Sequence, residues 1–192
     1  EKLCPQLHLP VQSGSNPVLQ KMARHYKIEM FYEQIAKWKA ICPDGGLSTD
    51  MIVGFPTETD EDFELTMKLC SDMKFDMVYA FAYSPRPGTK AAKLVDNVPL
   101  DVKNERLVKL QKHIIDIAAE HNKRWIGRTL EVLVEGPAKV MKSAPSDKMW
   151  QGRTPTNQVV NFPYEGHRDI AGQFFNVRID RVTGLALSGS LE

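Results

Sequence analysis

The sequence predicts an α/β segment followed by a small all-β domain, and three observations support this fold class. In the first part of the chain, strand-like apolar runs alternate with helix-like segments in the order β–α–β–α–β–α, which favours parallel strands joined by right-handed crossovers. Each strand-like run ends in small, polar, turn-forming residues. Beyond Gly127 the pattern changes to short runs of period two, which is typical of an antiparallel sheet. We therefore expect one domain at residues 1–125 and a second at residues 126–192.

The first strand-like run leads through residues 7–16 (LHLPVQSGSN) into a helical pattern. Asn16 followed by Pro17 is a favourable helix start, because Asn caps the first turn and the missing proline N–H costs nothing there. Apolar residues then recur at three- and four-residue steps as far as Ile41, where a PDGG turn follows shortly. The pattern predicts one helix from Asn16 to Ile41.

The second run, residues 48–59 (STDMIVGFPTET), contains a short apolar strand that ends at Gly54. Thr59 or Asp60 is expected to cap the helix that follows. The first turn of that helix is rich in carboxylates, which favour the positive end of a helix.

The third run, residues 77–89 (MVYAFAYSPRPGT), predicts a strand over residues 77–83 and then a loop rich in Pro and Gly. A long apolar stripe of helical period predicts a helix that begins at Asp101 and is ended by Gly127.

The second domain is predicted to be a small barrel of the oligonucleotide-binding kind. Its strand-like runs have period two and are separated by Gly, Pro, Asn and Asp. They occupy residues 129–136, 157–163, 173–180 and 184–189.

Composition favours a soluble globular protein, with 42% hydrophobic and 26% charged residues among 192. A net charge of +1 is no global sign of nucleic-acid binding, so any RNA affinity must come from local patches. No apolar run approaches the ~20 residues that span a bilayer, and the N-terminus lacks a signal-peptide pattern. We expect a cytoplasmic protein without membrane contact. Because the chain starts without Met almost directly on a strand, we expect it to be part of a longer protein.

The cysteines do not have the spacing of a metal site. Cys4, Cys42 and Cys70 are far apart in the sequence, whereas zinc sites and iron–sulfur clusters use closely spaced pairs or triplets. The histidines show no ligand spacing either. We therefore predict reduced thiols and no metal ligand in this chain.

The polar ends of the three strand-like runs, within residues 7–16, 48–59 and 77–89, are called the first, second and third tips. Their motifs resemble those of the radical-SAM methylthiotransferases, most closely the members that act on tRNA. The resemblance is carried by LHLPVQSGSN with MAR (residues 22–24), STDMIVGFPTET, FAYSPRPGT with VPLDVKNERL, and VLVEG with GRTPTNQVVNF, in family order. It implies the C-terminal half of a radical-SAM partial (β/α) barrel followed by an OB-like TRAM domain. It further implies methylthiolation of an isopentenylated adenosine beside the anticodon, and hence a tRNA anticodon stem-loop as partner.

The resemblance also implies S-adenosylmethionine and two 4Fe-4S clusters as cofactors. The CxxxCxxC motif of the family is absent from this chain, so the cluster ligands are expected outside it. We accordingly assign no catalytic residue here and expect the chain alone to be inactive.

The first tip offers an amide, hydroxyls and backbone N–H groups through Gln12, Ser13, Gly14 and Ser15. The resemblance makes these residues candidates for binding the ribose or methionyl part of the cofactor, or a substrate base. A turn that caps the next helix explains the same residues equally well. Arg24 is a candidate partner for a carboxylate on the same side, the alternative being a solvated arginine.

The second tip supplies further candidate cofactor contacts. Asp50 could orient a ligand hydroxyl or an arginine, or make a structural hydrogen bond. The resemblance places Ile52, Val53 and Gly54 beside the adenine of the cofactor. Glu58 either joins them or supports the start of the next helix.

The third tip contains the candidate substrate-binding residues Tyr83, Arg86 and Thr89, with Ser84 between them. Arg86 is the position that separates tRNA-acting members of the family from those that modify a ribosomal protein. A cation there suits a phosphate or a base edge of RNA. Tips of the ribosomal-protein-modifying members of the family tend to carry an acidic residue there. The alternative is a loop arginine that faces solvent.

In the second domain, basic residues are candidates for contacts with an RNA backbone, and aromatic residues for base stacking. The alternative is an ordinary basic surface around a core that contains the aromatic rings. The basic candidates are Lys139, Lys142, Lys148, Arg153, Arg168 and Arg178, and the aromatic ones Trp150 and Phe162.

Two other functions are compatible with the sequence. One is methylthiolation of an aspartate in a ribosomal protein, against which Arg86 and the basic second domain argue. The other is a non-catalytic RNA-binding module. If no strand pairs with the first of these parallel strands, the sheet has an edge with unpaired backbone N–H and C=O groups. We therefore also expect self-association through that edge.

Overall fold

The computed structural model describes residues 3–138 and 149–192. The chain divides into two compact units. One is an α/β unit, Leu7–Ile117, and the other comprises Ala118–Glu192 with the residues that precede Leu7.

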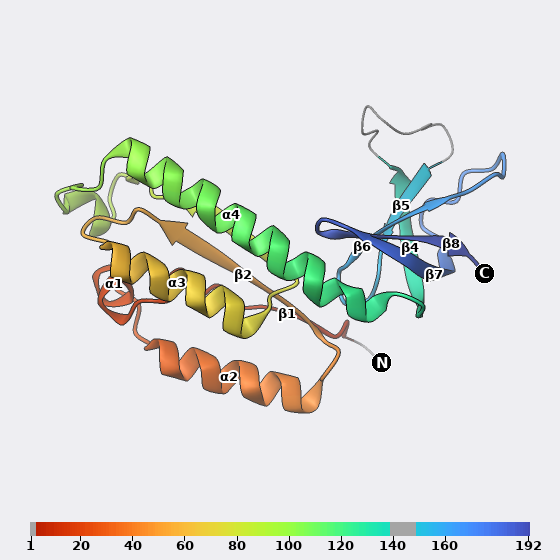
Figure 1. Ribbon diagram of the computed structural model, residues 1–192, viewed down its shortest axis with the longest axis horizontal. Coiled ribbons are helices and arrows are strands. Elements are labelled where there is room, and N and C mark those ends of the chain that lie inside the picture. The colour runs from red at the N-terminus through yellow and green to blue at the C-terminus, as the bar shows by residue number, and fades with distance from the viewer. Residues whose placement is uncertain (1–2, 139–148) are drawn as a thin grey trace. The chain divides into compact units, whose positions relative to one another are not determined.

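The α/β unit is built on a sheet with the strand order β1-β2-β3 (Figure 1). The central strand β2 runs parallel to β3, in register from Ser48 opposite Met77 to Val53 opposite Ala82. Beyond β1, the chain pairs again with β2 in parallel at Gln12 and Met51. The predicted parallel α/β architecture is therefore present. Its elements are β1 (Gln6–His8), α1 (Asn16–Lys21), α2 (Ile28–Ile41), β2 (Gly46–Val53), α3 (Asp60–Met73), β3 (Met77–Ala82), a 3₁₀ turn (Ala91–Lys93) and α4 (Leu100–Asn122).

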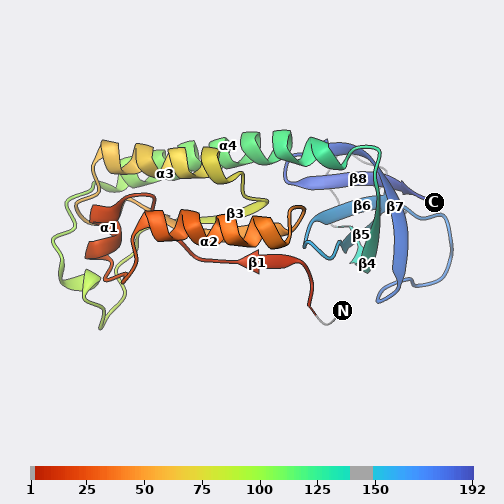
Figure 2. The same cartoon turned by 90° about the horizontal axis from the view of Figure 1, so that it is seen from below.

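Helices cover one face of this sheet, and no described helix of the α/β unit covers the other, which we call the open face. α3 and α4 lie side by side along the sheet (Figures 1 and 2). Met51 and Val53 of β2 are buried in the hydrophobic core that these helices share with α2. Because side chains alternate between faces along a strand, Asp50, Ile52 and Phe81 point to the open side.

The predicted single helix from Asn16 to Ile41 is wrong, since the chain forms two helices there. Ala23 adopts a left-handed conformation with φ 56°, which ends α1 and turns the chain. The Asn16 side chain accepts a hydrogen bond of 2.8 Å from Ile28 N, at the start of α2. Ser15 caps α1 instead. A long-range role of the Asn16 side chain thus replaced the local cap that the sequence predicted.

The starts and ends of the other helices follow local signals closely. Thr59 caps α3, which is one of the two caps that the sequence predicted, and the structure adds a capping box with Asp62. The last helix, α4, begins one residue before the predicted Asp101 and ends at Asn122. A 3₁₀ turn, Lys123–Trp125, then completes the path to Gly127.

The C-terminal unit contains a closed barrel with the strand order β4-β5-β6-β8-β7 (Figure 1). Alternate side chains such as Val132, Phe162 and Ile179 are fully buried inside it. The sequence missed β5, whose five residues have no clear alternation. The strands are β4 (Thr129–Pro137), β5 (Met149–Arg153), β6 (Val159–Pro163), β7 (Phe174–Thr183) and β8 (Ala186–Leu191).

Across the described ranges, no helix combines the length and the apolarity that a bilayer crossing requires.

Candidate functional site

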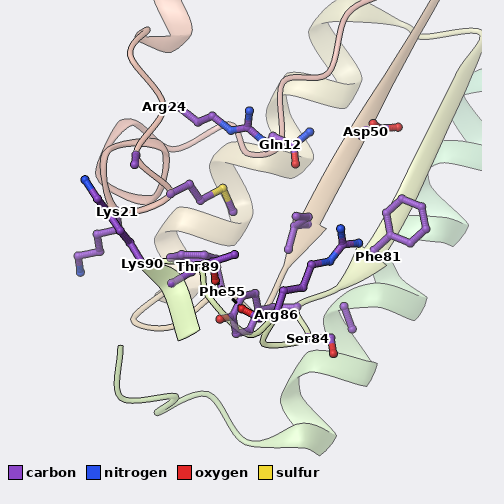
Figure 3. Close-up of a pocket in the computed structure, with 16 residues that line it drawn as sticks. Gln12, Lys21, Arg24, Asp50, Phe55, Phe81, Ser84, Arg86, Thr89 and Lys90 are labelled. Carbon is purple, nitrogen blue, oxygen red and sulfur yellow. Dashed lines mark hydrogen bonds between the residues drawn. The ribbon is translucent and has the colours of Figure 1, made fainter. Parts of the chain in front are cut away.

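A pocket of about 640 Å³ lies where the strand tips of the α/β unit meet (Figure 3). All three tips contribute to it, together with the turn between α1 and α2. Ligands bind at the carboxyl ends of parallel strands in such folds, and this volume is in the range of small-molecule sites. Its lining residues are Gln12, Lys21, Met22, Ala23, Arg24, Asp50, Ile52, Phe55, Phe81, Ala82, Tyr83, Ser84, Arg86, Thr89, Lys90 and Ala91.

The first tip presents Gln12 to this pocket and holds it firmly by its backbone. Gln12 N donates to Asp50 O and Gln12 O accepts from Ile52 N, each at 2.9 Å. The residue has a positive φ of 73°, which turns the chain away from β2. Its side-chain amide extends into the same space as the Arg24 guanidinium (Figure 3).

The other residues of the first tip, Ser13, Gly14 and Ser15, pack against α3. Gly14 N donates to Thr66 Oγ1 at 3.0 Å, and Ser13 Oγ lies 3.4 Å from the same hydroxyl. Ser15 Oγ donates to Asp62 Oδ1 at 2.5 Å and also accepts from Val18 N. Both serines are fully buried. These three residues do not line the pocket, and their geometry favours the turn-and-cap interpretation that the sequence left open.

Within the second tip, Asp50 and Ile52 line the pocket, whereas Val53 and Gly54 do not. Val53 is fully buried in the core. Gly54 adopts φ 68°, and a Cβ there would lie 2.3 Å from Cγ of Lys103. The glycine is thus required by the fold of the loop.

Glu58 supports this loop rather than the pocket. Its Oε1 accepts from Gly54 N at 2.7 Å and from Arg106 Nη1 at 2.8 Å, while Arg106 Nη2 reaches Asp60. Burial raises the pKa of the Glu58 carboxyl, and the hydrogen bonds from Gly54 and Arg106 oppose that rise. The arrangement clamps the turn that leads from β2 into α3.

The third tip brings Tyr83, Arg86 and Thr89 to the pocket. Thr89 Oγ1 donates to Arg86 O at 2.8 Å and accepts from Ala92 N, so this hydroxyl shapes the loop that carries Arg86. The Tyr83 ring packs edge-on against Phe55, with ring centroids 5.0 Å apart. Desolvation raises the pKa of Tyr83, with a smaller contribution from Asp96.

The charge of the pocket is mainly positive. Lys21, Arg24, Arg86 and Lys90 line it, whereas Asp50 is the one carboxylate among the lining residues. Arg24 and Arg86 extend into it from opposite sides (Figure 3). Guanidinium groups bind carboxylates and phosphates well, so the pocket suits an anionic ligand.

Several lining residues were missed by the sequence analysis, namely Lys21, Met22, Phe55, Phe81 and Lys90. Phe81 could have been found, because it lies two residues before Tyr83 on the same strand face. It is 55% exposed, and with Ile52 it gives the pocket an apolar wall. The sequence around Lys21 and Lys90 does not indicate that they line a pocket, because most lysines in helices and loops lie on the surface whether or not they bind a ligand.

Among the five candidate RNA-binding residues of the barrel unit that the structure describes, three are engaged in contacts within the protein or buried. Arg153 Nε forms an ion pair of 2.9 Å with Glu135, and Phe162 is fully buried, so its predicted stacking role is wrong. Trp150 is half-buried and packs edge-on against Tyr164. Exposed basic candidates are Arg178 on β7 and Arg168. Lys139, Lys142 and Lys148 lie outside the described residues.

The cysteines do not form a cluster site in the described parts of the chain. Cys4 is exposed, Cys42 intermediate and Cys70 buried, and all three are free. Burial raises the pKa of the Cys70 thiol to about 12. Within residues 3–138 and 149–192, no group of three or more His, Cys, Asp or Glu side chains could hold a metal ion. The residues present therefore do not fit an iron–sulfur cluster.

Comparison with known families identifies both parts of the chain. Residues 1–70 match the radical SAM superfamily, and residues 123–191 match the TRAM domain. The chain therefore joins a segment that matches the radical SAM superfamily to one that matches the TRAM domain, and the predicted fold class is confirmed. The matched family implies S-adenosylmethionine and iron–sulfur chemistry in general terms.

Curated proteins similar in sequence to this chain include tRNA-2-methylthio-N(6)-dimethylallyladenosine synthases. The chain is 44% identical to the one from Clostridium botulinum strain Langeland over 98% of its length. It is 46% identical to that of Geobacillus thermodenitrificans over the same share. It spans 40% and 35% of these two relatives, respectively. The solved structure of Escherichia coli coproporphyrinogen III oxidase, a radical SAM enzyme, overlays with a TM-score of 0.46 at 16% identity, covering 79% of this chain and 41% of that one.

Proposed function

We propose that this chain is the cofactor-binding and RNA-binding part of a longer cytoplasmic tRNA methylthiotransferase. That enzyme would add a methylthio group to N6-isopentenyladenosine next to the anticodon. The observation that carries the proposal is the 44–46% identity to synthases of that name over 98% of the chain. The pocket at the strand tips supports it independently, because its lining has the chemistry of a nucleoside site.

The cofactor side of the pocket is proposed to be Gln12, Arg24, Asp50 and Ile52. Ile52 and the neighbouring Phe55 offer an apolar surface for an adenine ring. Arg24 suits the carboxylate of an adenosyl amino acid, and Gln12 and Asp50 suit its hydroxyl or amino groups. These residues therefore fit S-adenosylmethionine. Ser13, Gly14, Ser15, Val53 and Gly54 would act indirectly, by holding the tips in place.

The RNA side is proposed to be Tyr83, Arg86 and Thr89, with Lys90 beside them. Arg86 would contact a phosphate or a base edge of the anticodon stem-loop, and Thr89 would hold the Arg86 loop through its hydrogen bond to Arg86 O. On the barrel, Arg153 and Arg178 are proposed to contact the RNA backbone, together with Lys139 and Lys142. Because Arg153 is ion-paired with Glu135, we expect it to contribute less than Arg178.

The two 4Fe-4S clusters of such an enzyme are proposed to have their ligands outside this chain. The scattered free cysteines support this view. This chain would then bind, orient and shield the reactants, and no catalytic step is assigned to it. The proposed domain boundary falls between residues 125 and 126, just after the 3₁₀ turn Lys123–Trp125.

Self-association through a sheet edge remains part of the proposal. In the described sheet, β1 and β3 are both edge strands, and unpaired edges can recruit another strand. Light scattering of the purified chain across a concentration series would measure it. A monomer at all concentrations would contradict it.

The function is tested by RNA binding of the 192-residue chain. The probe is an anticodon stem-loop RNA that carries N6-isopentenyladenosine, and the readout is its dissociation constant by fluorescence anisotropy. We expect Arg86→Glu to weaken binding about tenfold, which corresponds to ~1.4 kcal/mol. Lys93→Glu is the matched control, since it makes the same charge change in the adjacent 3₁₀ turn but does not line the pocket.

Equal loss in both variants would mean that net charge alone matters and would contradict the role of Arg86. Absence of RNA binding by the unaltered chain would contradict the proposed function. Tighter binding of a ribosomal-protein peptide that contains the target aspartate would favour the other methylthiotransferase reaction.

A further inference from the structure

A polar cluster lies on the open face of the sheet, next to the pocket. It consists of His8 from β1, Ser48 and Asp50 from β2, and Tyr79 from β3. His8 Nδ1 is 2.9 Å from Ser48 Oγ, and His8 Nε2 is 3.7 Å from Asp50 Oδ2. The His8 ring meets the Tyr79 ring edge-on, with centroids 6.0 Å apart. The imidazole is therefore held from three directions.

These contacts favour one of the two ring nitrogens as the site of the proton in a neutral imidazole. An ionised carboxylate can only accept hydrogen bonds, whereas a hydroxyl can donate or accept. A carboxylate charge 3.7 Å from Nε2 favours an N–H group over a lone pair at that nitrogen. We therefore expect the proton on Nε2, with Nδ1 accepting from the Ser48 hydroxyl.

Asp50 is the member of the cluster that lines the pocket. The distance of 3.7 Å to His8 Nε2 is too long for a direct hydrogen bond. Among the described residues, no side chain donates a hydrogen bond to the Asp50 carboxylate. Its oxygens are thus available for an N–H or O–H group of a ligand, and His8 acts on them only through electrostatic attraction at 3.7 Å.

Stability does not explain the cluster. The side chains of His8 and Asp50 are 40% and 32% exposed, and exposed ion pairs contribute little to folding. The other charged residues of the pocket lining are cationic, so an anionic ligand alone would not need a carboxylate there. A ligand with both a negative group and hydrogen-bond donors, such as an adenosyl amino acid, uses both features.

We propose that His8 is a positioning residue for this pocket, which acts through Asp50 and is oriented by Ser48. The Asp50 carboxylate accepts a hydrogen bond from a ribose hydroxyl or amino group of an adenosyl amino acid, and His8 holds the carboxylate in the accepting orientation. This inference rests on the proposed cofactor-binding function of the chain.

The test measures the dissociation constant of S-adenosylhomocysteine, an unreactive adenosyl amino acid, by ligand-observed NMR on the 192-residue chain. We expect Asp50→Asn to weaken binding about tenfold and His8→Phe to weaken it about fivefold, within the usual energy of a hydrogen bond to a charged group. His8→Gln should restore most of the affinity, because its amide retains an N–H donor. His113→Gln, whose ring lies between α3 and α4, is the matched control and should bind like the unaltered chain.

Two further readouts separate positioning from a structural effect. In the Asp50→Asn background, His8→Phe should cause no additional loss, since a residue that acts through Asp50 has nothing left to position. The ¹⁵N chemical shifts of His8 should show the proton on Nε2 in the unaltered chain, and Ser48→Ala should shift the tautomer balance.

Each contrary result has a distinct meaning. Additive losses from His8→Phe and Asp50→Asn, or full affinity in His8→Phe, would overturn the inference and leave the proposed function intact. A neutral His8 with its proton on Nδ1 would overturn the geometry on which the inference depends. No binding of S-adenosylhomocysteine by the unaltered chain would contradict the proposed cofactor site itself, and the assignment of His8 with it.

Discussion

Arg106 of α4 and Glu58 of the β2–α3 loop form a buried ion pair, with Nη1 and Oε1 2.8 Å apart and their side chains 9% and 0% exposed. The same Glu58 oxygen accepts from Gly54 N. The pair therefore links α4 to the turn that follows β2. Through that turn it sets the position of Phe55, which lines the pocket.

We expect Arg106→Met to lower the free energy of unfolding by about 3–5 kcal/mol, because it leaves the Glu58 carboxylate buried without its partner. Urea denaturation followed by circular dichroism measures this. Lys109→Met is the matched control on the same helix, since its exposed pair with Glu64 should contribute less than about 1 kcal/mol. Equal destabilisation by the two substitutions would contradict a larger contribution to stability from the buried Arg106–Glu58 pair than from the exposed Lys109–Glu64 pair.

Acid should weaken the surface network that joins α2 to α3, in which Tyr32 and Lys68 donate hydrogen bonds to the Asp72 carboxylate. Hydrogen bonds from Lys68 and then Tyr32 lower the pKa of Asp72. The folded state therefore favours the ionised carboxylate, which stabilises the protein above the usual Asp range near pH ~3.9. The contribution is lost as the pH falls below that range, through the lowered pKa of the folded state.

Asp72→Asn should accordingly destabilise the protein at neutral pH, by no more than about 1 kcal/mol for a surface network. The difference from the unaltered chain should vanish in strong acid. Denaturant titrations at several pH values measure it. A difference that stays constant with pH would contradict the assignment of the network to an ionised Asp72.

The cysteines should differ sharply in reactivity. The thiolate is the reactive form, and burial raises the pKa of Cys70 to about 12, whereas Cys4 is exposed. We expect Cys4 to react quickly with a thiol reagent in the native protein and Cys70 to react only after unfolding. Mass spectrometry of the labelled peptides distinguishes them, with Cys4→Ser as the control. Rapid native labelling of Cys70 would contradict its burial.

Gly14→Ala tests whether the first tip serves packing. A Cβ at Gly14 would lie 2.4 Å from Leu65 O in the backbone of α3, and overpacking of this kind costs about 1–3 kcal/mol. At Gly172 the Cβ would meet open space, although φ is 78°, so Gly172→Ala should cost only ~1 kcal/mol. Thermal unfolding of both variants measures the difference. A smaller loss for Gly14→Ala would argue against the close contact with α3.

Local signals predicted much of the fold because caps and alternation act over a few residues. The Thr59 capping box and the period-two strands of the barrel depend only on near neighbours. The break between α1 and α2 was missed for the opposite reason. It depends on the Asn16 side chain bonding Ile28 N twelve residues away.

The sequence by itself determined that polar strand tips gather at one edge of a parallel sheet, since parallel strands place their carboxyl ends together. Tertiary structure decided what each tip residue does. Ser15 donates a hydrogen bond to Asp62, and Gly14 donates one to Thr66. Both partners are about fifty residues away in the sequence, and neither Ser15 nor Gly14 lines the pocket. Lys21, Arg24, Arg86 and Lys90 line the same pocket as Asp50 only in the folded chain. Such encounters depend on how helices pack over the sheet, and no local pattern encodes that packing.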